Sequence, residues 1–148
     1  MSFRARNTIN GKEGRLFLEG EELAFIKMFE ADVEKEKEAV KIMGRVMDGH
    51  KSSGAAGTGT ATFYKVTSRF IQIMAEYIET GIDPYFTMQS VLDDKSAGQG
   101  TERVTLYDVN FDSVKVASLD VEKASLEEEV PFTFEGFDLP ESLKNTFN

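Results

Sequence analysis

Acidic residues occupy every second position along one charged stretch of the chain, which favours a strand over a helix. They are Glu30, Asp32, Glu34, Glu36 and Glu38. A helix would set like charges four residues apart, at a cost of roughly a few tenths of a kcal/mol for each pair, partly offset by opposite charges at other spacings. In a strand all five carboxylates lie on one face, opposite Phe29, Ala31, Val33, Lys35, Lys37 and Ala39. We therefore expect one long strand within residues 23–43, or two strands with a bulge near residues 34–37.

A Gly/Ser-rich segment and an amphipathic segment follow. The first predicts a flexible loop, which we place at residues 45–59, and residues 60–66 then predict a short strand. The apolar residues of the second segment recur with helical spacing at Phe70, Ile71, Ile73, Met74, Tyr77 and Ile78. Thr67 or Ser68 can cap this helix and Gly81 can end it. We expect its apolar stripe to pack on the protein's own core.

Short apolar or alternating segments predict strands in most of the remaining chain. They are residues 15–18, 86–92, 101–111, 115–119 and 129–134, with a turn at Gly20, a polar loop at 93–100 and a short polar tail from Leu139. The expected fold class is α+β, mainly an antiparallel β-barrel or sandwich of seven or eight strands, with one amphipathic helix packed against it. By size, residues 1–148 form a single domain with an N-terminal arm at residues 1–13.

The composition excludes several classes of protein. The chain has no cysteine and one histidine, so a disulfide framework is excluded and the usual soft-ligand metal sites nearly so. It has no apolar run of membrane-spanning length and no pattern of an export signal, so we expect no membrane-spanning segment and synthesis in the cytoplasm. Its basic residues are scattered and carry no aromatic platforms, which disfavours nucleic-acid binding.

Charge is unevenly distributed along the chain. The net charge is −9, yet residues 1–15 and 45–69 are basic, whereas residues 102–148 are strongly acidic. Opposite patches of this kind can steer and register contacts between copies. The alternative is a solvated surface with no partner.

Catalytic motifs are weak. Residues 44–52 resemble a phosphate-binding loop only loosely, because His50 separates the second glycine from Lys51. His50 itself has no partner that the sequence identifies, and the acidic runs at 93–94 and 127–129 are typical of solvated faces. We expect no enzymatic activity, no cofactor and no metal.

A series of landmarks covers nearly the whole chain in a characteristic order. They are Asn10-Gly11 and Gly14, Gly20-Glu21-Glu22, Phe29-Glu30-Ala31, Gly44, Gly49-His50-Lys51, residues 57–60, residues 64–68, Pro84-Tyr85-Phe86 and residues 130–136. In this order the chain resembles the tail tube proteins of contractile phage tails and phage-tail-like bacteriocins, in particular the tube subunits of PBSX-type defective prophages.

The resemblance implies hexameric rings that stack into a hollow tube inside a contractile sheath. It implies self-assembly and contacts with tail sheath, baseplate and tail terminator proteins, with DNA only as passing cargo if the particle is a phage. The particle, a virion tail or a bacteriocin, would assemble in the cytoplasm of the producing bacterium. An Hcp-like secretion tube and a small β-barrel binding module remain as alternatives.

Two sets of candidate site residues follow. The resemblance places the N-terminal arm with Arg4, Arg6 and Lys12, the loop with His50 and Lys51, and the C-terminal tail against the next ring. The strand pattern suggests that the acidic face (Glu30, Asp32, Glu34, Glu36 and Glu38) lines the lumen, because no core buries five carboxylates without matching cations. The alternative places that face on the outside of the tube, against the sheath.

Overall fold

The structure, a computed structural model, describes residues 3–145. Its short elements are the 3₁₀ helices η1 (Ala5–Asn7) and η2 (Gly11–Glu13) and the α-helix α1 (Arg69–Thr80). Its strands are β1 (Gly14–Leu18), β2 (Glu21–Glu22), β3 (Ile26–Val40), β4 (Gly49–Tyr64), β5 (Phe86–Leu92), β6 (Glu102–Phe111), β7 (Glu127–Phe134) and β8 (Gly136–Glu141). Every strand pairing is antiparallel, which confirms the predicted fold class.

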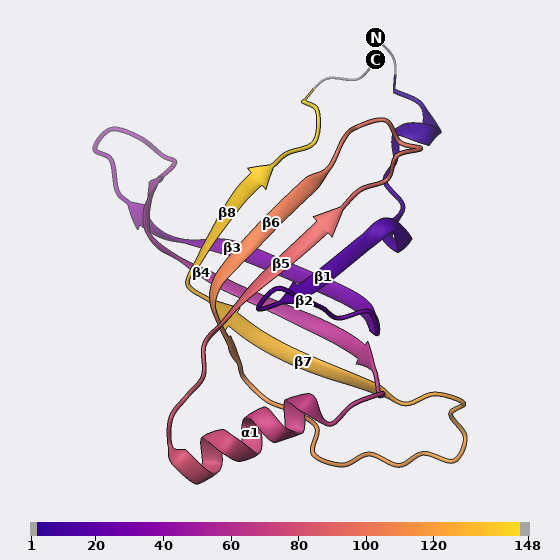
Figure 1. The fold of residues 1–148 in the computed structure, drawn as a ribbon. Coiled ribbons are helices and arrows are strands. Elements are labelled where there is room, and N and C mark those ends of the chain that lie inside the picture. The colour runs from indigo at the N-terminus through magenta and orange to yellow at the C-terminus, as the bar shows by residue number, and fades with distance from the viewer. Residues whose placement is uncertain (1–2, 146–148) are drawn as a thin grey trace.

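The strands form two layers joined by one strand (Figure 1). Neighbouring strands follow the order β2-β1-β5-β6-β7-β4-β3, and β8 pairs with β6. Most of β6 pairs with β5 and β8, whereas its last residues, Asn110 and Phe111, pair with β7. The path of paired strands stays open, with β2 and β3 at its two ends, so the fold is an open sandwich and not a closed barrel.

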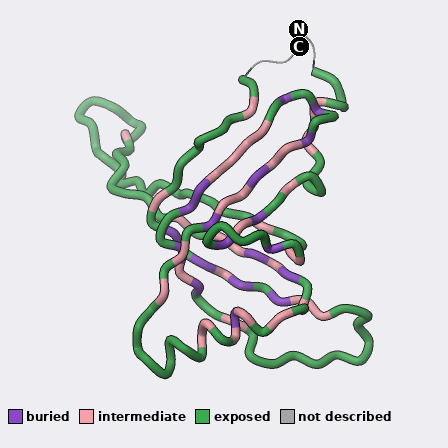
Figure 2. The backbone as a smooth tube through the Cα atoms, viewed as in Figure 1, coloured by how far each residue is buried: buried purple, intermediate pink, exposed green. Residues whose placement is uncertain are grey.

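Phenylalanine rings fill much of the core between the layers. Phe63 of β4 packs on Phe25 and on Phe70 of α1, with ring centroids 5.4 and 4.7 Å apart respectively. Phe70 in turn meets Phe111 of β6 edge-on at 5.6 Å. Figure 2 shows the buried residues concentrated along the central strands. The hydrophobic effect therefore holds the helix to the sandwich at its first turn.

The helix ends as predicted, but only its beginning belongs to the core. The Thr67 hydroxyl accepts a hydrogen bond from the Arg69 N–H at 3.3 Å, and Gly81 closes the helix with a left-handed φ of 74°. Phe70 is 1% exposed, whereas Ile78 is 73% exposed. The prediction that the whole apolar stripe packs on the core is wrong for its second half, because the helix runs away from the sheet after its first turns (Figure 1).

The strand predicted within residues 23–43 is confirmed, and the loop predicted at 45–59 is wrong from residue 49 onward. β4 begins at Gly49, which pairs with Val40, and it follows β3 along its whole length. The pairing skips Ser53, so this bulge lies in β4 and leaves the alternation of residues 28–40 of β3 unbroken, whereas a second shift skips Lys27 near the start of β3. Backbone bonds to β3 override the weak strand propensity of the Gly, Ser and Ala residues. Only residues 41–48 connect the two strands.

Two further predictions near the C-terminus are wrong. Residues 115–119 form no strand and lie in an irregular segment, residues 112–126. The tail predicted from Leu139 belongs instead to β8, which pairs with one edge of β6. Pro140 is tolerated there because β8 is itself an edge strand, where a missing backbone donor faces solvent.

Candidate functional site

The five acidic residues of β3 lie on the face of their sheet that is turned away from the core. Phe29 of the same strand stacks on Phe132 of β7, with ring centroids 5.7 Å apart, and so points toward the core. The acidic residues occupy the alternate positions, and all five are exposed. The strand register therefore brings Glu30, Asp32, Glu34, Glu36 and Glu38 onto one solvent-facing surface, which we call the acidic face.

Residues of β4 and β7 extend this surface, and the sequence analysis missed them. The residues opposite one another across the strands share a face: Thr58, Thr60 and Thr62 of β4, and Glu129 and Thr133 of β7. None of the five is buried. The alternation of threonines with small and apolar residues in positions 57–63 was the available signal, but those residues were assigned to a loop and a short strand.

The outer edge of β3 has no partner strand within the described part of the chain. β3 ends the order of paired strands and pairs with β4 alone. Residues 31–40 are exposed, as are residues 50–56 of β4, so the far half of this hairpin is a ribbon that is open on both faces. A two-stranded ribbon by itself is marginally stable in water, and a long free edge readily pairs with another strand.

The N-terminal arm is fastened to its own subunit. The Asn7 amide donates to the Ala97 carbonyl at 3.2 Å, and the buried Asp94 carboxylate accepts from the Asn10 N–H at 2.9 Å. The Lys144 N–H donates to the Gln99 carbonyl at 2.9 Å, which brings the C-terminal segment to the same loop. The structure thus gathers residues 3–13, residues 93–101 and Lys144 at one junction.

The predicted contact residues fall into two separate groups. Arg4, Arg6 and Lys12 lie exposed on the arm at this junction. His50 and Lys51 lie exposed at the start of β4, on opposite faces of the hairpin, since they pair with Ala39 and Glu38 respectively. Lys51 therefore sits at the far end of the acidic face.

Ionic contacts join the elements near these surfaces. Lys27 of β3 donates to Glu127 of β7 at 2.5 Å, and this hydrogen bond lowers the pKa of the Glu127 carboxyl and raises the pKa of the Lys27 amine. The Tyr107 hydroxyl donates to the Asp138 carboxylate at 3.0 Å, which raises the pKa of Tyr107 and ties β8 to β6.

The ion pair between Lys65 and Glu128 has a buried carboxylate. Glu128 is 3% exposed and lies 3.7 Å from the Lys65 amine, a distance longer than a hydrogen bond. Glu128 Oε1 and Lys65 Nζ have no hydrogen-bond partner among residues 3–145. Within the same residues no group of three or more His, Asp and Glu side chains is placed to hold a metal ion, and no helix is long and apolar enough to cross a membrane.

Comparisons with known proteins agree with the resemblance noted from the sequence. The family model for phage tail tube proteins matches residues 1–141. The phage-like element PBSX protein XkdM of Bacillus subtilis (strain 168) is 69% identical over 147 residues, which cover 99% of this chain and all of that protein.

Two solved structures share the fold at low sequence identity. A subunit of the sheath–tube complex of the PVC extracellular contractile injection system is 10% identical, with a TM-score of 0.68 over 91% of this chain and 93% of its own. A subunit of the cap that terminates the tube of the anti-feeding prophage is also 10% identical, with a TM-score of 0.70 over 96% of this chain and 95% of its own.

Proposed function

Because this chain belongs to the phage tail tube protein family and is a structural tube subunit, not an enzyme, we propose that six copies close into a ring and that the rings stack into a hollow tube. The observation that carries this proposal is the free edge of β3, a strand of 15 residues whose alternate backbone groups point to that edge. Pairing each β3 with an open strand edge of the next copy satisfies these groups, and repetition around an axis removes every such edge.

The acidic face is then the wall of the lumen. It lies on the side of the sheet opposite the core, so a ring built through β3 turns either this face or the rest of the sandwich toward its axis. Carboxylates and threonine hydroxyls keep such a wall hydrated, and the negative charge of the carboxylates repels the phosphates of DNA. DNA passing through the tube as cargo would therefore not adhere to it.

The remaining candidate residues contact the next ring. Arg4, Arg6 and Lys12 lie on the N-terminal arm, which hydrogen bonds to residues 93–101, and His50 and Lys51 lie at the start of the strand that follows the hairpin turn. All five side chains are exposed in the single subunit. Basic groups at these positions complement the acidic C-terminal third of a neighbouring copy.

We assign the sheath, baseplate and tail terminator as partners by the same reasoning. Two similar folds come from a sheath–tube complex and from a tube-terminating cap. The tube would assemble in the cytoplasm of the producing bacterium and become part of a virion tail or a bacteriocin.

Assembly of the purified protein tests the proposal. We expect concentrated protein to form rings and tubes that are visible by negative-stain electron microscopy. Two neighbouring proline substitutions, Ala31→Pro and Asp32→Pro, test the role of the free edge. Successive N–H groups of a strand point to opposite edges, so one variant loses a bond to β4 and the other loses only a donor at the free edge. The variant that loses only the donor at the free edge should stay a folded monomer and form no rings. Normal rings from both folded variants would refute closure through β3.

A further inference from the structure

The connection between β3 and β4, residues 41–48, carries apolar side chains that its own subunit does not cover. Met43 is 99% exposed, Val46 102% and Met47 78%. The ribbon that carries them stands clear of the sandwich (Figure 1), so folding of one copy cannot bury them. We call residues 41–48 the hairpin tip. Adjacent exposed apolar side chains of this kind mark contact surfaces.

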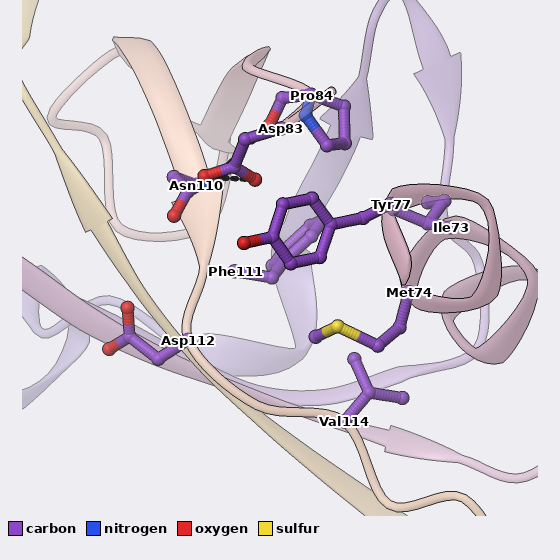
Figure 3. A pocket seen from close by; sticks show the side chains of 9 residues that line it. All are labelled: Ile73, Met74, Tyr77, Asp83, Pro84, Asn110, Phe111, Asp112 and Val114. Carbon is purple, nitrogen blue, oxygen red and sulfur yellow. Dashed lines mark hydrogen bonds between the residues drawn. The ribbon is translucent and has the colours of Figure 1, made fainter. Parts of the chain in front are cut away.

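A cavity of about 290 Å³ lies at the other end of the molecule, between α1 and the end of β6. Its apolar wall includes Ile73, Met74 and Tyr77 of the helix and Val114 of the segment after β6. Figure 3 shows Tyr77, Met74 and Val114 around one space, with Phe111 behind them. Of the helix side chains in this wall, Ile73 and Met74 are half-buried and Tyr77 is exposed, and Ile73 also packs against the core.

The tip and the cavity also differ in charge. Arg45 of the tip forms no ion pair within residues 3–145, and Lys41 pairs with Asp48 only at 3.9 Å. The cavity is lined by two carboxylates, Asp83 and Asp112, both in exposed positions. The hairpin tip, which is apolar and carries an arginine, is therefore complementary to the cavity, which is apolar and has carboxylates at its rim.

We propose that the hairpin tip of one copy inserts into the helix cavity of a second copy, with Arg45 beside Asp83 and Asp112. This inference rests on the proposed tube and names the receptor for its stacking contact. The tip and the cavity are at opposite ends of the fold, so one copy cannot fill its own cavity (Figure 1). A contact between two different surfaces repeats head to tail, and it builds a stack when it joins copies of successive rings instead of closing around one ring.

Disulfide cross-linking tests this contact without background, because the chain has no cysteine. The pair Val46→Cys and Val114→Cys, introduced into one chain and oxidised after assembly, should give a ladder of covalent multimers on a non-reducing gel. A disulfide needs Cβ atoms about 4 Å apart, so the ladder requires the tip to enter the cavity. The matched control is Val46→Cys with Val121→Cys, which places the second thiol on the same irregular segment away from the cavity lining.

The outcomes separate this contact from the tube itself. Well-formed tubes with no ladder, a ladder only in the control, or a dimer from Val46→Cys alone would overturn the contact and leave the tube proposal standing. Absence of rings and tubes in the unmodified protein would overturn both. A charge exchange gives a second readout: Arg45→Asp should abolish stacking, and Asp112→Arg in the same chain should restore it. Failure to restore, with both variants folded, would also overturn the contact.

Discussion

The ring of Phe134 in β7 occupies the space beside Gly57 in β4 that any larger residue would need, since a Cβ at position 57 would lie 2.6 Å from Phe134 Cε2. Phe132 stands in the same relation to Gly59, two residues along. The two glycines let the rings lie flat across β4 and fill the core behind the acidic face. Packing thus requires glycine at positions 57 and 59, so these two glycines are not a sign of flexibility.

Substitution at these glycines should test that relation. A Cβ at residue 59 would stand 2.5 Å from the Glu30 carbonyl oxygen and also against Phe132, so neither the backbone nor the ring can yield freely. We expect Gly59→Ala to lower the free energy of unfolding by about 1–3 kcal/mol, the usual cost of overpacking. The control is Gly54→Ala, whose Cβ would meet only Glu36 Oε2 at 3.7 Å. Denaturant titration of the monomers measures both, and equal stabilities would contradict the packing argument.

Strand alternation and helical spacing predicted most of the fold, and the failures have physical causes. The acids of β3 were predictable because their alternation is local. The first half of β4 was not, because residues 49–59 become a strand through bonds to a partner that the local sequence does not announce. β8 likewise depends on the edge of β6, and the segment 115–119 has the composition of a strand but no partner.

Substitutions in the first and second halves of the helix should differ in their effect on the stability of the monomer. Phe70→Ala removes a ring that touches Phe63 and Phe111, and we expect it to cost about 3–5 kcal/mol of monomer stability. Ile78→Ala, at a position 73% exposed, should change that stability by no more than about 0.5 kcal/mol. Thermal or denaturant unfolding distinguishes the two. A large loss of monomer stability from Ile78→Ala would mean that the second half of the helix packs on its own subunit after all.

The Lys27–Glu127 pair should give stability that depends on pH at both extremes. Its hydrogen bond lowers the pKa of Glu127 in the folded state, so the contribution is present above the ordinary value of 4.5 and is lost as pH falls through the lowered one. It raises the pKa of Lys27, so the contribution is present below 10.5 and is lost as pH rises through the raised value. Glu127→Gln should remove this dependence, whereas Glu129→Gln should keep it, as measured by unfolding across pH. Both side chains are partly exposed, so the effect should be small and weaken in salt.

The Tyr107–Asp138 contact should be visible in tyrosine titration. The hydrogen bond to the Asp138 carboxylate raises the pKa of Tyr107 above its ordinary value of 10.0. The stabilisation is therefore present below that pH and is lost as pH rises through the raised value. Asp138→Asn should move one of the four tyrosines to a lower pKa in the ultraviolet phenolate titration. The control Asp120→Asn, outside this contact, should leave the curve unchanged. A curve that Asp138→Asn also leaves unchanged would mean that the bond does not form in solution.

The sequence predicted the residues of the acidic face but not the cavity beside α1. The sequence placed five carboxylates on one face, but it could not show which layer that face belongs to, because the stacking of Phe29 on Phe132 joins residues more than a hundred positions apart. It also could not show the cavity beside α1, which β6 and the helix form together. Long-range packing of this kind leaves no periodic signal in either segment.

The last prediction concerns the charge of the lumen. The triple variant Glu30→Gln, Glu34→Gln and Glu36→Gln removes three carboxylates from the acidic face and leaves Asp32 and Glu38 to keep it polar. These side chains are exposed, so the monomer should fold and tubes should still form. Carboxylates on the wall concentrate cations within about one Debye length of it, about 10 Å at 0.1 M salt. We therefore expect the cation selectivity of the tube to fall, as measured from its reversal potential under a salt gradient.

A second triple variant separates the lumen from net charge. Glu76→Gln, Glu79→Gln and Glu122→Gln remove the same charge from exposed positions outside the acidic face, so they should leave selectivity unchanged if that face lines the channel. Unchanged selectivity in the first variant, with normal sheath assembly, would rule out the lumen assignment. Loss of sheath assembly in the first variant alone would place the acidic face on the outside of the tube, because only a surface in contact with the sheath can lose that partner when its carboxylates are neutralised.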